Sequence, residues 1–351
     1  MVWVESDGLI GYGDCAPLPA AGTETYEAAG AALERLIARL PGLDVETRRA
    51  EDIEALLTEL DAANDMAATP AVRFALECAL ADLASHRQGL SLRHWLAPEA
   101  ANSLAVNAML GTLGVVRGED LALSHGQGFG VLKLKVGVET TMSDLESLIA
   151  LFRHQSIGVG MGVSLRLDAN GAWSFDQARW IIERLAQLQL LIESIEEPLA
   201  EPTPERLAEL QALAPFPLAL DESLPTQFAA PHMTTQLADL DPARLGVRRL
   251  VLKPAALGGL RRTLVLACRA QDAGIEVVVT SLVESAAGLW PTAQLAGAIA
   301  SSIPQGLATA DWLAADLGQA PRPHTGWIEL PEPSGSGFAP FKASWPEQLL
   351  R

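Results

Sequence analysis

The sequence predicts an α/β protein in which a barrel of parallel strands follows a smaller region of mixed helices and strands. Short apolar runs alternate with amphipathic helical patterns from about residue 103, and successive runs lie roughly 30 residues apart, the size of a βα unit. Polar residues end nearly every run, whereas a doubly wound open sheet, the structural alternative, normally carries its ligand at one switch point. A chain of 351 residues is long enough for one large barrel and a smaller domain.

The first part of the chain, residues 1–100, predicts the smaller α+β domain. Residues 2–14 have the pattern of a strand, a Gly-containing turn and a second strand. Three helical patterns follow, at about 23–40, 51–63 and 70–87. The third helix has a clear start signal, because Thr69 can cap it and Pro70 suits the first helical position.

The barrel is expected over residues 101–317. Its eight strands are centred near the following residues: Ala105, Lys133, Arg166, Ser194, Ala219, Val251, Val279 and Leu307. Helix starts agree with this spacing, since Ser174 with Gln177 forms a capping box and Thr203-Pro204 opens the next helix. The tail, about 318–351, is rich in Pro and Gly and has no place in the barrel, so we expect it to return to the N-terminal domain.

Composition excludes several classes of function. The formal net charge of −18 argues against binding of nucleic acid or of an anionic membrane surface. The sequence has no apolar run long enough to span a membrane, and residues 1–8 lack the pattern of a signal peptide. Cys15, Cys78 and Cys268 are few and far apart, which predicts reduced cysteines and a cytoplasmic protein.

Three acidic residues end three successive apolar runs, with lysines on the runs before and after them. Asp168, Glu196 and Asp221 are the acids; Lys135 ends the preceding run and Lys253 the following one. Buried strands tolerate charge only when it is paired or bound to a metal. Three oxygen ligands without His or Cys suit a hard cation, Mg²⁺ or Mn²⁺, better than zinc. The pattern therefore predicts a divalent cation between two potential bases.

Barrel geometry assigns positions to the lysines. The second and sixth strands of a ring of eight lie opposite each other, so Lys135 and Lys253 should face one another across whatever the metal holds. Strand alternation points Lys133 and Lys135 to the same side. Metal binding neutralises a substrate carboxylate and makes the adjacent carbon acid more acidic, and a lysine beside a cation can have a pKa low enough to act as a base. We therefore expect proton removal next to a carboxylate.

A structural interpretation competes at individual positions. One acidic residue at a strand end is usually a helix cap or a solvated loop residue, which is our interpretation of Glu193, Glu197 and Glu222. Lys133 could equally be a structural ion-pair partner, and Gly258-Gly259 could form a tight turn or let the backbone approach a ligand. The histidines miss the predicted strand ends and are interpreted as surface or helix residues: His86, His94, His125, His154, His232 and His324.

These motifs resemble the enolase superfamily, specifically its muconate lactonizing enzyme subgroup. The resemblance covers nearly the whole chain and is carried by Lys133-Leu-Lys135, Arg166-Leu-Asp168-Ala-Asn170, Glu196-Glu-Pro198, Asp221-Glu-Ser223 and Lys253-Pro254. It implies a modified TIM barrel, (β/α)7β, with an α+β capping domain built from the N-terminal segment and the tail. It also implies the family's Mg²⁺-dependent chemistry with a lysine base, and Asp168, Glu196 and Asp221 as the metal ligands.

Within the subgroup the chain is most similar to the o-succinylbenzoate synthase family, through Arg166, Gly171-Ala-Trp173, Lys253–Gly259 and Thr280–Ser285. This similarity implies syn dehydration of 2-succinyl-6-hydroxy-2,4-cyclohexadiene-1-carboxylate in menaquinone biosynthesis. Lys135 would be the base and the acid for the departing hydroxyl, and Lys253 would stabilise the enediolate from the opposite face. A loop at about residues 16–25 would close over the site. The implied substrate contacts are Lys133, Arg166, Asn170, Gly259, Thr280 and Ser281.

Other activities of the subgroup stay open as alternatives: N-acylamino acid racemase, dipeptide epimerase and muconate cycloisomerase. Epimerases carry an Asp-x-Asp pair near the end of strand 8, and here Asp311 and Asp316 have a different spacing. A non-catalytic barrel is disfavoured, because the three acids and both lysines are present. Family members also carry a strand before Val2–Glu5, so we expect either a start assigned too late or the loss of an edge strand. The expected partner is a small-molecule carboxylate, and the oligomeric state stays open, a homo-oligomer included.

Overall fold

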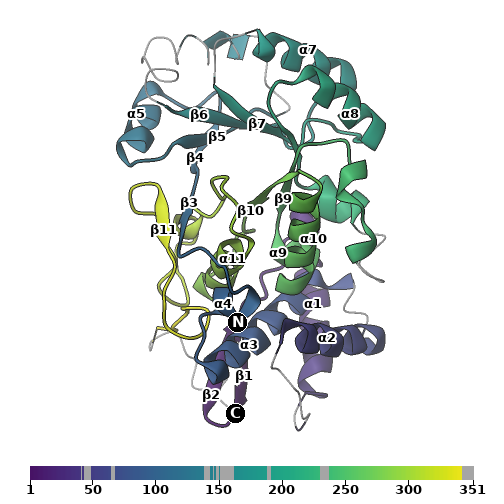
Figure 1. Cartoon of the computed structure of the whole chain (residues 1–351), viewed down its shortest axis with the longest axis vertical. Helices are drawn as coiled ribbons and strands as arrows, with labels where there is room; N and C mark the ends of the chain where they lie inside the picture. The colour runs from purple at the N-terminus through teal and green to yellow at the C-terminus, as the bar shows by residue number, and fades with distance from the viewer. Residues whose placement is uncertain are drawn as a thin grey trace.

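The computed structural model describes residues 1–40, 42, 49–64, 68–137, 143–144, 146–147, 150, 162–187, 191–229 and 237–341, and the structural statements below concern these residues. Its largest sheet has seven parallel strands that curl into most of a barrel (Figure 1). In spatial order they are β4 (Ala108–Thr112), β5 (Val131–Lys135), β6 (Ser164–Asp168), β7 (Ile192–Glu196), β8 (Leu218–Leu220), β9 (Arg249–Leu252) and β10 (Glu276–Val279).

A short segment around Gln305 and Gly306 closes the ring in place of an eighth strand. The backbone N–H of Asn107 donates to the carbonyl of Gln305 at 3.0 Å, and the N–H of Gly306 donates to the carbonyl of Val279 at 2.9 Å. The segment therefore bridges the start of β4 and the end of β10, next to the predicted eighth strand at Leu307. The predicted fold class, an α/β modified TIM barrel, is confirmed.

The predicted position of the first barrel strand is wrong by a few residues. Ala105 belongs to β3 (Ser103–Ala105), which lies outside the barrel and pairs antiparallel with β11 (Trp327–Glu329) from the tail. The barrel strand is β4, which pairs with β5 from Ala108 onward. Two short apolar runs adjoin here, and only the distant partner β11 decides which of them enters the barrel.

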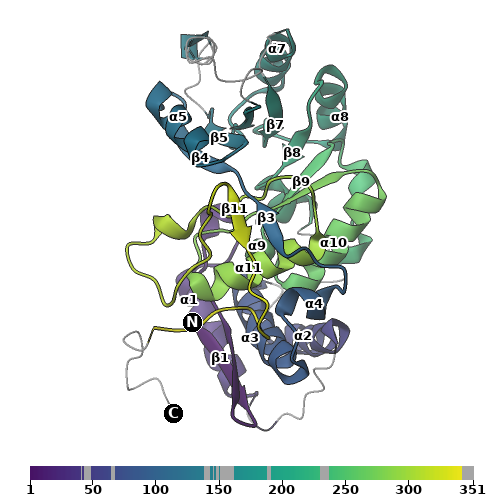
Figure 2. The same cartoon turned by 60° about the vertical axis from the view of Figure 1, so that its left-hand side comes forward.

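Helices cover the outside of the barrel (Figure 2). They are α5 (Gly118–Gly126), α7 (Phe175–Ala186), α8 (Pro204–Leu213), α10 (Leu260–Asp272) and α11 (Ala286–Ile299). The predicted capping box at the start of α7 is present: Gln177 N–H donates to Ser174 Oγ at 3.3 Å, and Ser174 N–H donates to Gln177 Oε1 at 2.9 Å. Thr203 likewise caps α8 by accepting from the N–H of Arg206 at 3.3 Å.

The N-terminal region consists of a hairpin and three long helices, as predicted. The hairpin joins β1 (Val2–Ser6) and β2 (Leu9–Gly13), and the helices are α1 (Tyr26–Ile37), α2 (Ala50–Asn64) and α3 (Pro70–Gln88). The cap of α3 differs from the prediction. The Thr69 side chain does not cap the helix, and the carboxylate of Glu24 accepts from the N–H groups of Ala71 and Val72 at 3.0 and 2.9 Å instead.

The described part of the tail contacts the N-terminal region, while residues 342–351 of the expected tail lie outside the described residues. Gly335 exchanges backbone hydrogen bonds with Leu90 and with Leu92 at the start of α4 (Leu92–Leu96), and the N–H of Ser336 donates to Asp82 of α3 at 2.6 Å. These contacts tie the tail to α3 and to the residues between α3 and α4.

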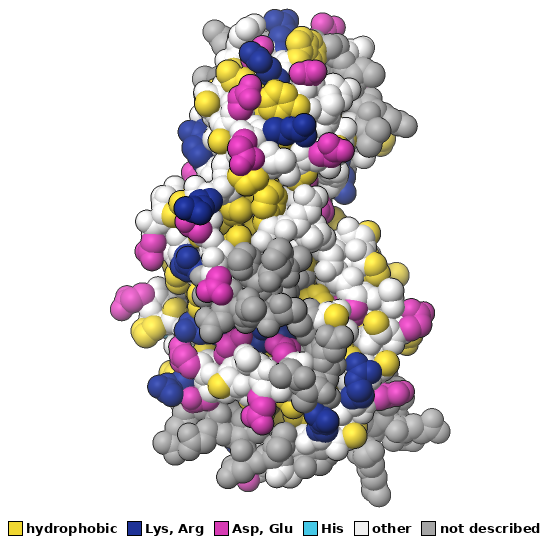
Figure 3. Space-filling view, turned by 90° about the vertical axis from the view of Figure 1, so that its right-hand side faces the viewer, with side chains coloured by type: hydrophobic (Ala, Val, Ile, Leu, Met, Phe, Trp, Pro, Cys, Tyr) yellow, Lys and Arg dark blue, Asp and Glu magenta, His cyan; other side chains and the backbone are white. Residues whose placement is uncertain are grey.

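Acidic and basic side chains are mixed on the described surface. On the face in Figure 3, described Lys and Arg side chains are scattered among Asp and Glu side chains and form no continuous basic surface. Among the described residues, every helix is too short or too polar to cross a membrane.

Candidate metal centre and active site

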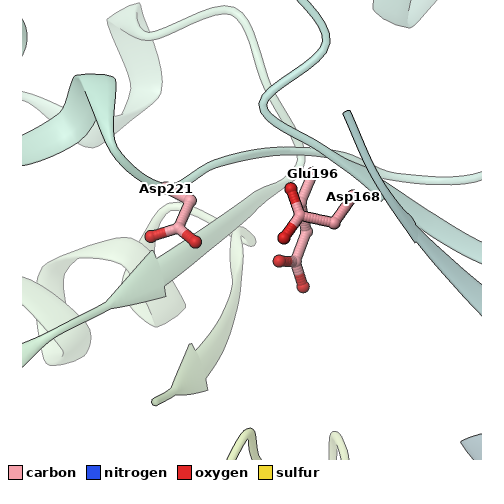
Figure 4. A group of neighbouring side chains, drawn as sticks. All are labelled: Asp168, Glu196 and Asp221. Carbon is pink, nitrogen blue, oxygen red and sulfur yellow. The ribbon is translucent and has the colours of Figure 1, made fainter. Parts of the chain in front are cut away.

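Three carboxylates meet at the carboxyl ends of neighbouring strands (Figure 4). Asp168 ends β6, Glu196 ends β7 and Asp221 follows β8, and each is at most 2% exposed. One oxygen of each residue lies within 4.8 Å of the others. Asp168 and Glu196 are aligned in the sheet register, so the parallel strands themselves bring these side chains together. A cluster of buried carboxylate oxygens without nitrogen or sulfur ligands suits a hard divalent cation.

Two lysines contact this cluster from different sides. Lys133 Nζ lies 2.9 Å from Asp168 Oδ2 and also pairs with Glu196 Oε2. Lys253 Nζ lies 2.6 Å from Asp221 Oδ1 and 3.4 Å from Glu222 Oε1. Burial alone would lower the pKa values of both ammonium groups, but the adjacent carboxylates outweigh burial and raise them. Both side chains are therefore cationic.

Burial shapes the protonation of the carboxylates. It raises the pKa of Glu196 although Lys133 acts in the opposite direction, and it raises the pKa of Asp221 to about 6 although Lys253 opposes the shift. Crowded carboxylates with little access to water favour protonation, so a bound cation would stabilise their charged forms.

The cluster lines a cavity of about 330 Å³ together with both predicted catalytic lysines. Strands β5 and β9, which carry Lys135 and lead to Lys253, have three strands between them in the sheet, so they lie on opposite sides of the closed ring. A molecule bound at the carboxylate cluster would therefore have Lys135 on one face and Lys253 on the other.

Neutral side chains form part of the cavity lining. Thr280 and Ser281 line the cavity together with apolar residues of the barrel. The Thr280 hydroxyl donates to the carbonyl of Gly306 at 2.8 Å, and the hydroxyls of Ser281 and Thr309 are 2.7 Å apart. Leu18, with neighbouring residues of the predicted loop, contributes to the lining. This part of the lining combines hydroxyl groups with apolar surface.

Arg166 lines the cavity but is committed mainly to the barrel interior. Its guanidinium donates to Glu193 at 3.0 and 3.3 Å, to Asn107 Oδ1 at 3.1 Å and to the carbonyl of Pro304 at 3.0 Å. It also lies 3.6 Å from Glu196 Oε1. Through these contacts Arg166 links residues on both sides of the barrel closure, Asn107 and Pro304, to Glu196, a predicted metal ligand.

Two other predicted substrate contacts, Asn170 and Gly259, lie in different places relative to the cavity. Asn170, with a left-handed φ of 46°, lines the cavity and donates to Glu222 Oε1 at 3.2 Å. Gly259 does not line the cavity and faces Glu77 and Arg73 of α3 instead. The turn interpretation of Gly258-Gly259 is the one that the structure favours.

Three polar residues have roles at this site that sequence reasoning did not assign to them. Glu222 and Asn107 line the cavity. Glu197 accepts from the N–H groups of Asp221 and Ser223 at 2.8 and 3.2 Å and so orients the segment after β8, and burial raises its pKa to about 7. The adjacent acidic pairs Glu196-Glu197 and Asp221-Glu222 were the sequence signal for these roles, because each of the four side chains has a hydrogen-bond or ion-pair partner in the structure.

Comparison with known proteins identifies the family. Residues 119–343, more than half of the chain, match the family described as Enolase C-terminal domain-like, and the chain belongs to it. It is an enzyme of the enolase superfamily, as the strand-end motifs predicted.

Relatives that match the chain include o-succinylbenzoate synthases and dipeptide epimerases. Over 333 residues the chain is 29% identical to o-succinylbenzoate synthase of Desulfotalea psychrophila, covering 88% of this chain and 85% of that protein. It is 27% identical over 307 residues to hydrophobic dipeptide epimerase of a Flavobacteria bacterium, with 85% and 79% covered. The solved structure of dipeptide epimerase from Enterococcus faecalis, complexed with Mg and the dipeptide L-Leu-L-Tyr, has a TM-score of 0.78 and 26% identity over 95% of this chain and 90% of that one.

Proposed function

We propose that the chain is an o-succinylbenzoate synthase, a carbon–oxygen lyase that dehydrates 2-succinyl-6-hydroxy-2,4-cyclohexadiene-1-carboxylate to 2-succinylbenzoate in menaquinone biosynthesis. One observation carries the proposal: two lysines on opposite walls flank a carboxylate cluster, and the same cavity also offers hydroxyls and apolar groups for an uncharged or anionic chain. The similarity to the synthase of Desulfotalea psychrophila supports it.

The proposed cofactor is Mg²⁺, with Mn²⁺ as a substitute, held by Asp168, Glu196 and Asp221. The buried oxygen-only donor set fits such an ion. When bound, the ion neutralises the substrate carboxylate and makes the neighbouring C–H bond more acidic. The lysines beside the cluster add further positive charge near the same substrate group.

Lys135 is the proposed base and acid. Its neutral amine takes the proton from the carbon that bears the substrate carboxylate, and the resulting ammonium returns a proton to the departing hydroxyl on the same face. One C–H bond and one C–O bond break, water leaves, and the ring becomes aromatic. Lys253 keeps its positive charge on the opposite face, held there by Asp221 and Glu222, and stabilises the negative charge that develops on the substrate carboxylate.

The remaining contacts are proposed from the cavity lining. Lys133 and Asn170 flank the carboxylate end, while Thr280 and Ser281 face the succinyl group and Leu18 covers it. Arg166 acts indirectly, through its contact with Glu196. The same proposal treats residues 1–100 with the tail from about 318 as a capping domain, residues 101–317 as the catalytic barrel, and the protein as cytoplasmic.

Dipeptide epimerisation is the second candidate, because two opposed lysines also suit proton exchange at one carbon and an epimerase is among the relatives. A dipeptide carries an ammonium group that needs an acceptor. Asp311 pairs with Arg322, and Asp316 accepts from the N–H groups of Ala286 and Leu317 at 2.8 and 2.6 Å, so neither of the two acids lines the cavity. This arrangement favours dehydration.

The test is a direct comparison of substrates. Purified protein with Mg²⁺ is assayed with the cyclohexadiene carboxylate and, separately, with dipeptides, N-acylamino acids and muconate. We expect kcat/KM for dehydration to exceed that for each other substrate by at least about two orders of magnitude. A higher value for any of the other substrates would overturn the assignment.

A further inference from the structure

Two side chains of the N-terminal helix α3 hold the turn that follows Lys253. In Figure 1, α9 (Pro254–Leu257) and α10 lie between strand β9 and the N-terminal helices. Lys253 is the residue before α9, and its carbonyl accepts from the N–H groups of Ala256 and Leu257 at 3.0 and 2.9 Å. The position of the Lys253 backbone therefore depends on where this short helix is fixed.

Glu77 fixes the far end of the turn. Its buried carboxylate accepts from the N–H of Leu260 and from the N–H of Arg261, each at 2.8 Å, which are the first N–H groups of α10. A negative charge at a helix start is stabilised by the unpaired N–H groups there. Glu77 thus serves α10 as an N-terminal cap that comes from another part of the chain.

Arg73, one turn earlier on α3, holds the middle of the same turn. It is fully buried, and its Nη1 donates to the carbonyl of Gly258 at 2.5 Å. The guanidinium is itself oriented by Glu54 at 2.7 Å and Asp61 at 3.0 Å, both from α2. The contact is close: a Cβ on Gly259 would lie 1.9 Å from Glu77 Oε2, and the φ of Gly259 is +148°. Only glycine allows α3 to approach the turn this closely.

We infer that Glu77 and Arg73 are positioning residues for Lys253. They hold the middle and the far end of the Gly258-Gly259 turn, α9 transmits this position to Lys253, and the Lys253 ammonium is thereby placed 2.6 Å from Asp221. Neither residue lines the active-site cavity. The inference rests on the proposed function for its kinetic consequence, and on geometry alone for the placement of Lys253.

The test compares Glu77→Gln with Asp82→Asn. Both replace one buried carboxyl group of α3 with an amide, and Asp82 also accepts two backbone N–H groups, from Tyr12 at 3.0 Å and Ser336 at 2.6 Å, at the side of the helix that faces β2 and the tail. In Glu77→Gln the amide can accept only one of the two N–H groups of α10 and places its own N–H groups against the other. We expect kcat to fall by about 10- to 100-fold with KM within about twofold, since a displacement on the order of 1 Å costs about that much.

A second measurement reports the placement of Lys253 without any reaction. Lysines are labelled with acetic anhydride and quantified by mass spectrometry, with Lys133 as the internal reference. We expect Lys253 to label several-fold faster in Glu77→Gln and at the wild-type rate in Asp82→Asn. If Glu77→Gln does not fold, Glu77→Asp is measured by the same criteria.

Unchanged kcat and unchanged Lys253 labelling in a folded Glu77 variant would overturn the inference. Equal losses of kcat in the Glu77 and Asp82 variants would overturn it as well, because that result indicates a general structural role. If the wild-type protein fails to dehydrate the proposed substrate, the proposed function is wrong, and the labelling result still decides whether Glu77 positions Lys253.

Discussion

A buried charge layer inside the barrel should make stability depend on pH through Glu193. Its carboxylate pairs with Arg166 at 3.0 Å and with Arg249, two guanidinium groups that are almost fully buried. Burial alone would raise the pKa of Glu193, but the two guanidinium groups outweigh it and lower the pKa from 4.5 to about 2. Because the folded pKa lies below the unfolded one, the stabilisation is complete above pH 4.5 and is lost as the pH falls through about 2.

The magnitude follows from the size of the shift. At about 1.4 kcal/mol per pKa unit, the ionised Glu193 contributes about 3 kcal/mol at pH 7 and about 2 kcal/mol at pH 3.5. Removing one partner from a buried ion pair independently predicts a loss of about 3 to 5 kcal/mol. We therefore expect Glu193→Gln to lower the free energy of unfolding by about 3 kcal/mol at pH 7, with a smaller deficit at pH 3.5.

Urea unfolding followed by tryptophan fluorescence at both pH values measures this difference. Glu276→Gln is the matched control, because Glu276 pairs with the same Arg249 at 2.6 Å but its side chain is 40% exposed. The control should lose less than about 1 kcal/mol, as exposed pairs do. A Glu193→Gln variant as stable as the control, or a deficit that is the same at both pH values, would refute the account of this charge layer.

The remaining predictions concern the lysines and one turn. Lys135→Arg should abolish dehydration, because arginine does not act as a base, whereas Lys253→Arg should keep measurable activity if its guanidinium fits; near wild-type dehydration by Lys135→Arg would show that Lys135 is not the base. Gly246→Ala should lower the free energy of unfolding by on the order of 2 to 4 kcal/mol, because its φ is +77° and the new Cβ would lie 2.2 Å from the carbonyl of Pro204. Gly274→Ala, with a φ of +75° and open space around it, should cost only about 1 to 2 kcal/mol, and equal losses in the two glycine variants would contradict the steric argument.

Much of the site could be predicted because parallel strands impose its geometry. The carboxyl ends of successive strands meet at one edge, so acids that end consecutive apolar runs must converge, and the structure brings Asp168, Glu196 and Asp221 together. The regular spacing located seven of the eight barrel segments for the same reason. The separation of Lys135 and Lys253 by half a ring followed directly from counting strands.

The features that sequence reasoning missed depend on partners far away in the chain. Ala105 was placed in the barrel because its pairing with β11 leaves no local signal. Gly259 was assigned to the substrate, but its neighbour is Glu77 of a helix that precedes it by more than half the chain. Arg166 has the position of a substrate ligand in its motif, and its guanidinium is nevertheless committed to Glu193, Asn107 and Pro304. The local sequence pattern identifies residues that are unusual for their position, and only the tertiary contacts show which groups each of these residues contacts.

The most direct test of the central claim measures dehydration as a function of Mg²⁺ on chelator-treated protein. The substrate is the cyclohexadiene carboxylate, aromatisation is followed by ultraviolet absorbance, and Glu196→Gln is assayed beside the wild type. We predict that EDTA abolishes the activity, that Mg²⁺ or Mn²⁺ restores it, and that Glu196→Gln remains folded with a rate lower by several orders of magnitude, on the order of 10³-fold or more. Full dehydration by chelator-treated protein, or by Glu196→Gln, would contradict the proposed metal-dependent mechanism.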